Sequence, residues 1–456
     1  MNFGKTILEY KDDILKDLST LISIQSVSGE NGKECKQALD FILKKAKSFG
    51  LDTRDIEQIA GHAELKGGKT LCGVLTHLDV VPSGNNWSTM PFELTRKDGK
   101  LYGRGIADDK GAALITLYCL KALKDKGIKG KNTLRAIFGT DEERGMNDMD
   151  TYFTYEPIPD YSFTPDSEYG ICKSEKGIIQ LELYADLNSA TTLTQFHSGK
   201  AINAVPDTAY ALFDCTENED HQFLRLADAM EGNFEFYYTI DGMMVLSRGK
   251  SSHACHPEKG FNAATALINL MCANFYLPSM GQICSFIHTR IGMETDGNSL
   301  GIKMRDSDSG ALTLNVGTVH VQEHYATATL DIRYPVTVDP KIIISRIESA
   351  ANTEGLHVKM LNHSLPINID KDSALVKLLS SAYENVTGEK PIIYSTGGGT
   401  YARKLGGKGV GFGPIFPGEE SNMHNCDECI DEEKFFLHAQ ICLEAMYDLY
   451  TKELNS

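Results

Sequence analysis

The sequence has no long apolar run, no excess of positive charge and no leader-like start. No segment approaches the roughly 18 unbroken apolar residues of a membrane-spanning helix, which argues against a membrane protein. With 62 Asp and Glu against 45 Lys and Arg, the formal charge of −17 argues against nucleic-acid binding. The start, MNFGKTILEYKDDILKDL, has acids where a signal peptide has its apolar core, so we expect a cytoplasmic protein.

Cysteine and tryptophan are thinly used. Eleven cysteines spread over 456 residues are typical of buried thiols in a reducing compartment and not of a disulfide framework. Cys426 and Cys429 form a Cys-x-x-Cys without a second pair or a thioredoxin-like strand pattern. We interpret them as structural, with a redox role beside His424 as the alternative. Trp87, the single tryptophan, is expected to pack under a loop.

Alternating helix and strand patterns predict an α/β fold. Apolar residues recur at helical spacing from Ile7 to Leu51, with a break near Gly29, which predicts two amphipathic helices. GAALITLYCLKALKDKG predicts a helix stopped by glycine. Between 177 and 364, short strands such as TLNVGTVHV alternate with helices such as FNAATALINLMCANF. We therefore predict an inserted α+β domain at 177–364, flanked by the two parts of a first domain, 1–176 and 365–456.

Four strand-like runs lead to polar side chains. TLCGVLTHLDV ends near His77, NTLRAIFGTDEE at an acidic triplet, YSFTPD at Asp166, and GVGFGPIFPGEESNMH leads to His424. Ligands of open α/β sheets gather outside the carboxyl ends of the strands. We therefore expect these side chains to converge.

Each polar motif, taken alone, can also be explained by a purely structural role. His77 and Asp79 form a His-x-Asp pair, in which a carboxylate often holds the second nitrogen of a metal-bound imidazole, but so short a pattern is weak. In LYGRGIADDKG the glycines would let Asp108 or Asp109 approach an ion, although one of the two could be an N-cap.

The acidic triplet of FGTDEERG, Asp141 to Glu143, could simply begin a helix, which the helix dipole favours. On an extended segment, however, neighbouring side chains point in opposite directions, so Glu142 and Glu143 could serve two different partners. Two histidines with several carboxylates suit zinc, manganese or cobalt, whereas calcium prefers oxygen ligands throughout. The set is rich enough for two ions.

In order along the chain, HLDVVP, GRGIADDKG, TDEERG, FTPDSE, GKSSHACHPEKGFNAATAL, LDIRYP, GGGTYAR and a late MH resemble the dinuclear zinc aminopeptidase and amidohydrolase family. That family includes aminoacylases, carboxypeptidase G and the PepV-type dipeptidases. The match runs from about residue 10 to the C-terminus. VPSGNNWSTMPFE, NAVPD and STGGGTYAR make the PepV-like dipeptidases the nearest resemblance.

The resemblance implies a mixed-sheet catalytic domain with an enlarged lid, and two divalent ions, zinc first with manganese or cobalt as alternatives. One ion would be held by His77, Asp108 and Asp166. Asp108 would bridge to the second ion, which Glu143 and His424 would complete.

The resemblance also implies the catalytic residues. Asp79 would hold His77, and Glu142 would be the general base that deprotonates the metal-bridging water. His253 would stabilise the tetrahedral oxyanion, because the Gly-x-x-x-His register from Gly249 selects it over the neighbouring His256.

Substrate-binding residues follow from the same comparison. Arg333 would clamp the substrate carboxylate, unless it is a solvated face residue, and Asn203 would bind near the scissile amide or the carboxylate. Gly398 and Thr400 could complete the carboxylate site as a backbone nest.

We thus predict a metal-dependent dipeptidase that cleaves short unblocked peptides. An N-acyl-amino-acid amidohydrolase is the alternative, and a non-catalytic metal-binding or peptide-binding relative is the remote one. The enlarged lid implies that His253 acts on its own chain's ions, that the lid closes over the substrate, and that a monomer can be active.

Overall fold

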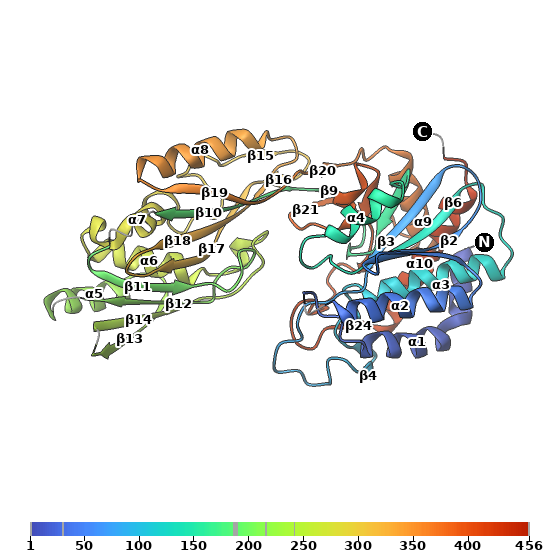
Figure 1. Ribbon diagram of the computed structural model, residues 1–456, viewed down its shortest axis with the longest axis horizontal. Coiled ribbons are helices and arrows are strands. Elements are labelled where there is room, and N and C mark those ends of the chain that lie inside the picture. The colour runs from blue at the N-terminus through green and yellow to red at the C-terminus, as the bar shows by residue number, and fades with distance from the viewer. Residues whose placement is uncertain (1, 30–31, 186–189, 215–216, 241, 455–456) are drawn as a thin grey trace. The chain divides into compact units, whose positions relative to one another are not determined.

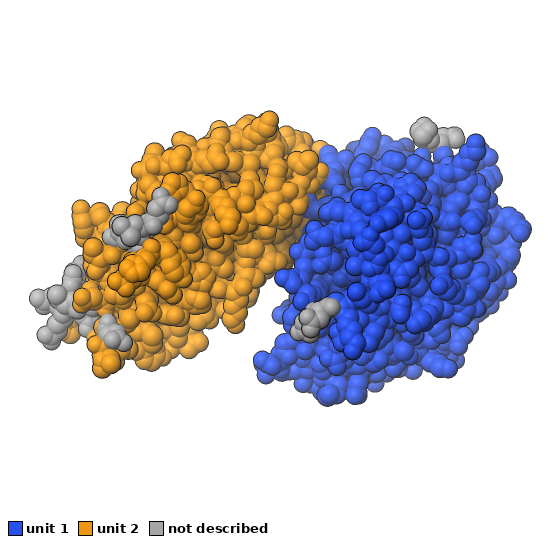
Figure 2. All heavy atoms as spheres, viewed as in Figure 1, with its two compact units in different colours: residues 1–174, 367–394, 399–456 blue, residues 175–366, 395–398 orange. Residues whose placement is uncertain are grey.

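The computed structural model describes residues 2–29, 32–185, 190–214, 217–240 and 242–454, without the side chains of 217–220 and 222. The chain forms two compact units (Figure 2). Unit 1 is Met1–Ser174, Ile367–Tyr394 and Gly399–Ser456, and unit 2 is Glu175–Pro366 and Ser395–Gly398. Unit 2 begins two residues before the insertion predicted from the sequence, ends two residues after it and takes in Ser395–Gly398 as well.

Unit 1 is built on a mixed nine-stranded sheet with the order β1-β2-β6-β3-β7-β22-β9-β20, and with β21 paired to β9 (Figure 1). β3 is parallel to β6 and β7, and β7 to β22, whereas β1, β2 and β9 join antiparallel. The strands are β1 (Asp52–Ile56), β2 (Ala60–Leu65), β3 (Leu71–His77), β6 (Thr133–Gly139), β7 (Tyr161–Thr164), β9 (Ile171–Glu175), β20 (Ile367–Asn368), β21 (Ile393–Thr396) and β22 (Gly409–Gly411). The predicted α/β mixed-sheet class is confirmed.

Helices cover both faces of this sheet because alternate strand residues point to opposite sides. Val74 of β3 packs in the main core with α3, whereas its neighbour Leu75 packs with α4 and η4. The helices are η1 (Phe3–Tyr10), α1 (Lys11–Ser23), α2 (Lys33–Ser48), α3 (Lys110–Asp125), α4 (Asn147–Tyr155), α9 (Ala374–Thr387), η4 (Tyr401–Leu405) and α10 (Glu432–Thr451). The two helices expected near the start and the helix expected over 111–127 are confirmed as α1, α2 and α3.

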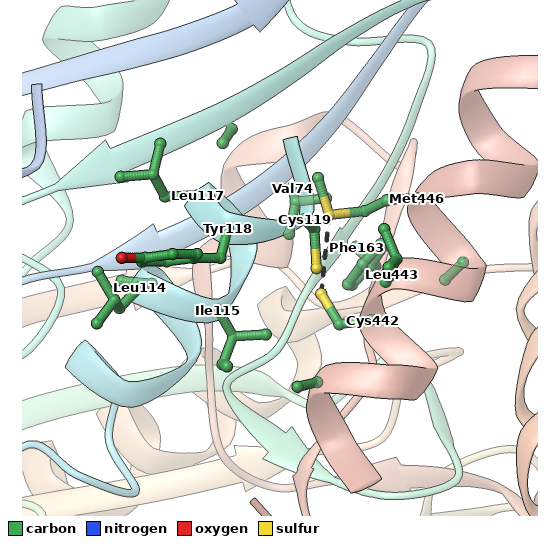
Figure 3. Close-up of a cluster of buried hydrophobic side chains, with 14 of the residues drawn as sticks. Val74, Leu114, Ile115, Leu117, Tyr118, Cys119, Phe163, Cys442, Leu443 and Met446 are labelled. Carbon is green, nitrogen blue, oxygen red and sulfur yellow. Dashed lines mark hydrogen bonds between the residues drawn. The ribbon is translucent and has the colours of Figure 1, made fainter. Parts of the chain in front are cut away.

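α3 is buried along nearly its whole length, since it lies between the sheet and α10. Figure 3 shows the contact: Cys119 of α3 faces Cys442 of α10, whose Sγ lies 3.8 Å from Met446 Sδ. Burial, together with the neighbouring Cys442, raises the pKa of the Cys119 thiol. Apolar side chains from β3 and β7, Val74 and Phe163, close the cluster. The helix that follows the loop of Asp108 and Asp109 is therefore fixed by packing against the sheet and α10.

Short strand pairs connect the loops of unit 1. A three-stranded sheet joins β4 (Thr95–Lys97), β5 (Lys100–Tyr102) and β24 (Cys429–Asp431), so the segment directly before α10 lies beside the strand that leads to the loop before α3. β8 (Ser167–Glu168) pairs with β23 (Pro414–Ile415).

Unit 2 is an antiparallel eight-stranded sheet packed against helices (Figure 1). α6 contacts β12, β14 and β17, whereas α7 contacts β10 and β18, and α8 contacts β19. In sheet order the strands are β13 (Asn233–Thr239), β14 (Gly242–Arg248), β12 (Thr208–Phe213), β11 (Leu193–Ser198), β17 (Thr313–Val321), β18 (Ala326–Tyr334), β10 (Gly177–Ala185) and β19 (His357–Ser364).

The helices of unit 2 are α5 (Glu217–Ala229), η2 (Pro257–Lys259), α6 (Ala263–Asn274), η3 (Leu277–Met280), α7 (Gly281–Arg290) and α8 (Pro340–Thr353). β15 (Arg305–Asp306) and β16 (Gly310–Ala311) form a separate hairpin. Within the described ranges of both units, no helix combines the length and apolar content that crossing a membrane requires.

Two histidines are buried in unit 1 away from the strand ends. His438 of α10 lies 2.9 Å from the hydroxyl of Tyr169, and His62 of β2 lies 2.8 Å from that of Tyr152. Burial lowers the pKa of His438 to about 3, and burial with the nearby Arg135 lowers that of His62 to about 3. Both side chains are therefore neutral in the folded protein at mildly acidic pH.

These histidines should make unit 1 less stable in acid. The unfolded chain binds a proton at each of them below a pKa of 6.5, whereas the folded chain does so only near 3. The free energy of unfolding should therefore fall with pH through this window by up to about 1.4 kcal/mol per pH unit for each histidine. Urea unfolding at pH 6.5 and 5, followed by Trp87 fluorescence, should show a smaller pH dependence in His438→Gln. His324→Gln, at a side chain 81% exposed, is the control, and equal slopes in wild type and His438→Gln would contradict the prediction.

Candidate metal centre

Three parallel strands deliver polar side chains to one edge of the unit 1 sheet. His77 is the last residue of β3 and lies opposite Gly139, the last residue of β6. The acidic triplet follows β6 in the turn before α4, and Asp166 follows β7 by two residues. Because parallel strands end at the same edge, the convergence expected from the sequence has a direct structural cause.

His77 is fully buried and lies between two carboxylates. Its Nε2 is 2.9 Å from Asp108 Oδ1. Its Nδ1 is 2.9 Å from the backbone oxygen of Asp79 and 3.4 Å from Asp79 Oδ1. Burial alone would lower the pKa of His77, but Asp108 and Asp79 raise it well above its ordinary value. Nδ1 is thus held by Asp79, and Nε2 faces the carboxylate of Asp108.

Asp79 also fixes the two glutamates. Its Oδ1 accepts the backbone N–H of Glu142, and its Oδ2 that of Glu143, both at 3.2 Å. The hydroxyl of Ser28 donates to Oδ2 at 2.5 Å. The sequence predicted only the contact with His77; the link to the acidic turn and the contribution of Ser28 were missed. Nothing in the local pattern signals either, since Ser28 is 51 positions away.

Asp108 stands between the two histidines. Its Oδ1 faces His77, and its Oδ2 lies 2.9 Å from His424 Nε2. His424 Nε2 is also 3.2 Å from Glu143 Oε2. Asp166 Oδ2 approaches His77 Nε2 to 4.0 Å. Asp108 thus contacts both histidines, each through a different carboxylate oxygen.

The three acids after β6 separate in space. Atoms of His77, Asp108 and Glu143 lie within 4.8 Å of one another, and so do atoms of His77, Glu142 and Asp166. By distance alone, either Glu142 or Glu143 could therefore contribute an oxygen to a bound ion. Asp141 instead accepts the backbone N–H of Asn147, the first residue of α4, at 3.2 Å. The triplet therefore does not begin a helix, because α4 starts only at Asn147: Asp141 is a turn residue that contacts the start of α4, while the two glutamates face the cluster.

Among the described residues, the carboxylates of Asp79, Asp108, Glu142, Glu143 and Asp166 outnumber the two imidazoles of His77 and His424 that pair with them. Burial, and after it the neighbouring carboxylates, raises the pKa of Glu142, Asp166 and Glu143. The Oε1 atoms of both glutamates are buried without a protein hydrogen bond. Burying ionised carboxylates is costly unless cations compensate them. Imidazole nitrogens and carboxylate oxygens together suit zinc or manganese, so the donor set fits two divalent ions.

In unit 2, Asn203 and His253 are neighbours. The backbone oxygen of Asn203 accepts the N–H of Ala254 at 2.9 Å, and Ala204 forms a β-bridge with His253. The N–H of Cys255 donates to His253 Nδ1 at 3.1 Å. The imidazole is therefore oriented through Nδ1 by its own loop.

Arg333, in β18, is only 4% exposed, which excludes the solvated-face alternative. Its Nε and Nη2 donate to the two oxygens of Asp331 at 2.6 and 2.9 Å, and its Nη1 to the backbone oxygen of Gly397 at 3.0 Å. Three of the five N–H groups of the guanidinium are thus engaged. The Asp331 partner was missed, although residues two apart on a strand share a face and the pattern Asp-x-Arg could have revealed it.

The other predicted residues divide between the units. Gly398 belongs to unit 2, where its N–H donates to Thr396 Oγ1 at 3.1 Å. Thr400 belongs to unit 1, where its hydroxyl caps η4 by accepting the N–H of Ala402. Cys429 is buried in β24 and Cys426 is half-buried, and a redox role for them stays a hypothesis.

Comparison with known proteins gives consistent matches. The model of Peptidase family M20/M25/M40 matches residues 73–448. The chain is 33% identical over 470 residues to "Putative dipeptidase YtjP" of Bacillus subtilis (strain 168), which covers 98% of this chain and 100% of that protein. It is 33% identical over 473 residues to "Putative dipeptidase SSP1012" of Staphylococcus saprophyticus, covering 98% and 99%.

Solved structures share the fold at low identity. Human carnosine dipeptidase 1 superposes with a TM-score of 0.63 at 14% identity, over 98% of both chains. The di-peptidase Dug1p from Saccharomyces cerevisiae gives a TM-score of 0.60 at 14% identity, also over 98% of both chains.

Divalent ions should stabilise unit 1, because they compensate the buried carboxylates. At a free ion concentration 100 times the dissociation constant, each bound ion should add about 2.7 kcal/mol to the free energy of unfolding. Thermal unfolding of chelator-treated protein, with and without added Mn²⁺ or Zn²⁺, measures this gain. Asp108→Asn should lose most of the gain and Asp141→Asn should keep it. An ion-independent melting temperature in the wild type would contradict the proposed centre.

Proposed function

The chain belongs to Peptidase family M20/M25/M40, and on that premise we propose that it is a metal-dependent dipeptidase that hydrolyses short unblocked peptides. The observation that carries this proposal is the cluster at the strand ends, with Asp108 between His77 and His424 at 2.9 Å from each. The dipeptidase names of relatives aligned over 98% of the chain support the substrate class.

The proposed ligand assignment is the one that the family resemblance implies. We propose that His77, Asp108 and Asp166 hold one ion and that Asp108, Glu143 and His424 hold the other. When bound, two such ions polarise the scissile carbonyl and lower the pKa of water, which makes a nucleophile available near neutral pH. Asp79 keeps His77 oriented by facing its Nδ1.

Glu142 is the proposed general base. Its backbone is fixed by Asp79, and its buried Oε1 has no protein hydrogen bond. A carboxylate at this place can take a proton from the attacking water and return it to the leaving amine. Glu142 also lies near His77 and Asp166, so removal of its side chain tests whether it acts as base or as ligand.

Residues of unit 2 are proposed to bind the substrate. Arg333 is held rigidly by Asp331 and Gly397, which suits recognition of a carboxylate by its remaining N–H groups. Asn203 and Gly398 keep their predicted roles in substrate binding, as does Thr400 of unit 1, and His253 keeps its predicted role in oxyanion stabilisation. Cytoplasmic residence and activity as a monomer likewise stay predictions from the sequence.

Replacement of Glu142 should separate proton transfer from metal binding. Glu142→Gln should lower kcat by about 10²- to 10⁴-fold, because a positioned general base contributes about that much. The measurement is dipeptide hydrolysis together with metal content, which should stay at two ions per chain. Asp141→Asn, one residue earlier, is the control and should keep its activity. Full activity in Glu142→Gln would exclude the base role, and loss of one ion would assign Glu142 as a ligand.

A substrate panel tests the proposed substrate class. Purified protein, stripped and reloaded with zinc or manganese, should cleave free dipeptides faster than N-acylated amino acids and tripeptides. A dipeptidase recognises two charged termini at a fixed separation, and acylation removes one of these charges. Cleavage confined to N-acylated compounds would instead make the protein an amidohydrolase. Absence of hydrolysis with both ions bound would favour a non-catalytic relative.

A further inference from the structure

A buried ion pair lies beside the metal centre in unit 1. Arg104 and Glu428 are each 1% exposed, and Arg104 Nη1 donates to Glu428 Oε2 at 2.6 Å. A buried pair of this kind is often no more stabilising than apolar side chains of the same size, because both charges lose their water. We therefore looked for the role of this ion pair in the backbone groups that the two side chains bind.

Glu428 holds the loop that carries Asp108. Its carboxylate accepts the backbone N–H groups of Gly105 at 3.0 Å, Ala107 at 2.9 Å and Asp108 at 3.3 Å. Gly105 has a φ of +88°, and a Cβ there would come within 2.8 Å of the Val80 side chain, so only glycine allows this turn. The loop thus wraps closely around a single carboxylate.

Arg104 fastens two further loops to the same point. Its Nη2 donates to the backbone oxygens of Pro82 and Ser83, both at 3.3 Å, and to that of Asn425 at 3.0 Å. Its guanidinium carbon lies 5.2 Å from the centre of the Trp87 ring. The tryptophan therefore packs against this arginine, and Asn425 is the residue directly after His424.

Among the proposed ligands compared here, His424 depends most on contacts of its loop, such as that between Arg104 and Asn425. His77 ends a central strand, and the backbone of Glu143 is held by Asp79. His424 instead lies in the loop between β23 and β24, and its side chain is 49% exposed. The loop meets the rest of the site at Asn425 and at Glu428, whose backbone oxygen accepts the N–H of Gly103 at 3.1 Å.

We propose that Glu428 and Arg104 are positioning residues for the second ion, the one assigned to Asp108, Glu143 and His424. Glu428 binds the backbone of Asp108 and lies four residues after His424, so the pair sets the distance between these two ligands. The inference rests on the proposed two-ion centre. Neither residue is a ligand; both act through the position of the loops.

The test is the dissociation constant of each ion in Glu428→Gln. This change keeps the size of the side chain and removes the negative charge that accepts the backbone N–H groups of Gly105, Ala107 and Asp108. Metal-free protein is titrated with Mn²⁺ or Zn²⁺ in competition with a coloured chelator. One ion should bind about 10- to 100-fold more weakly, as is typical when a group that orients a ligand is lost, and the other should bind as in the wild type. In a His424→Ala background, Glu428→Gln should not weaken the remaining ion further.

Glu156→Gln is the matched control. It removes a carboxylate that is also buried in unit 1 and that pairs with Arg135 at 2.7 Å and with Arg54. It should lower the melting temperature and leave both dissociation constants unchanged. Arg104→Lys keeps a positive charge but shortens the reach to the carbonyls, and should weaken the same ion even if the Glu428→Gln protein does not fold.

Three outcomes would overturn the inference. Unchanged constants for both ions in a folded Glu428→Gln or Arg104→Lys protein would do so, and so would equal weakening of both ions. A wild-type protein that binds fewer than two ions would overturn the proposed centre itself and the inference with it.

Discussion

Repulsion among buried carboxylates is the constraint on which the site of this protein depends. Parallel strands bring His77, the glutamate turn and Asp166 to one edge of the sheet, where His77 is fully buried and the acids are partly buried. Acids in such a place are unfavourable unless cations join them. Without ions, the carboxylates at the strand ends therefore repel one another. Binding of divalent ions would relieve this repulsion, which favours ion binding.

Asp79 shows how one side chain can serve two requirements. It faces His77 Nδ1 and accepts the N–H groups of Glu142 and Glu143, so the ligand from β3 and the acids after β6 share one reference point. Because these groups share Asp79, a shift at the end of β3 or at the end of β6 would move several side chains of the cluster together. Rigidity behind the site comes from α3, packed between the sheet and α10.

The sequence predicted the convergence of these side chains because their signals are local. Strand patterns ending at His77, at the acidic triplet and at Asp166 follow from side-chain alternation and the behaviour of parallel sheets. The hydrogen bonds from the loop before α3 to Glu428 could not be predicted in this way, because Glu428 lies 323 positions from Gly105 and the contact leaves no periodic pattern in the sequence. The pairing of Asp331 with Arg333 does have a local signal, because residues two apart on a strand share a face. The different roles of Glu142 and Glu143 also depend on family resemblance, since geometry brings both to the cluster.

The fastening of His424 through Glu428 has a consequence for the order of assembly during synthesis. Asp108 lies in the first quarter of the sequence, whereas His424 and the carboxylate that holds its loop come more than 300 residues later. Domains generally fold from the N-terminus as the chain emerges. A nascent chain would thus carry His77, Asp108 and Asp166 long before the second ion could be held. Hydrolytic competence would then appear only after the ribosome has passed Glu428.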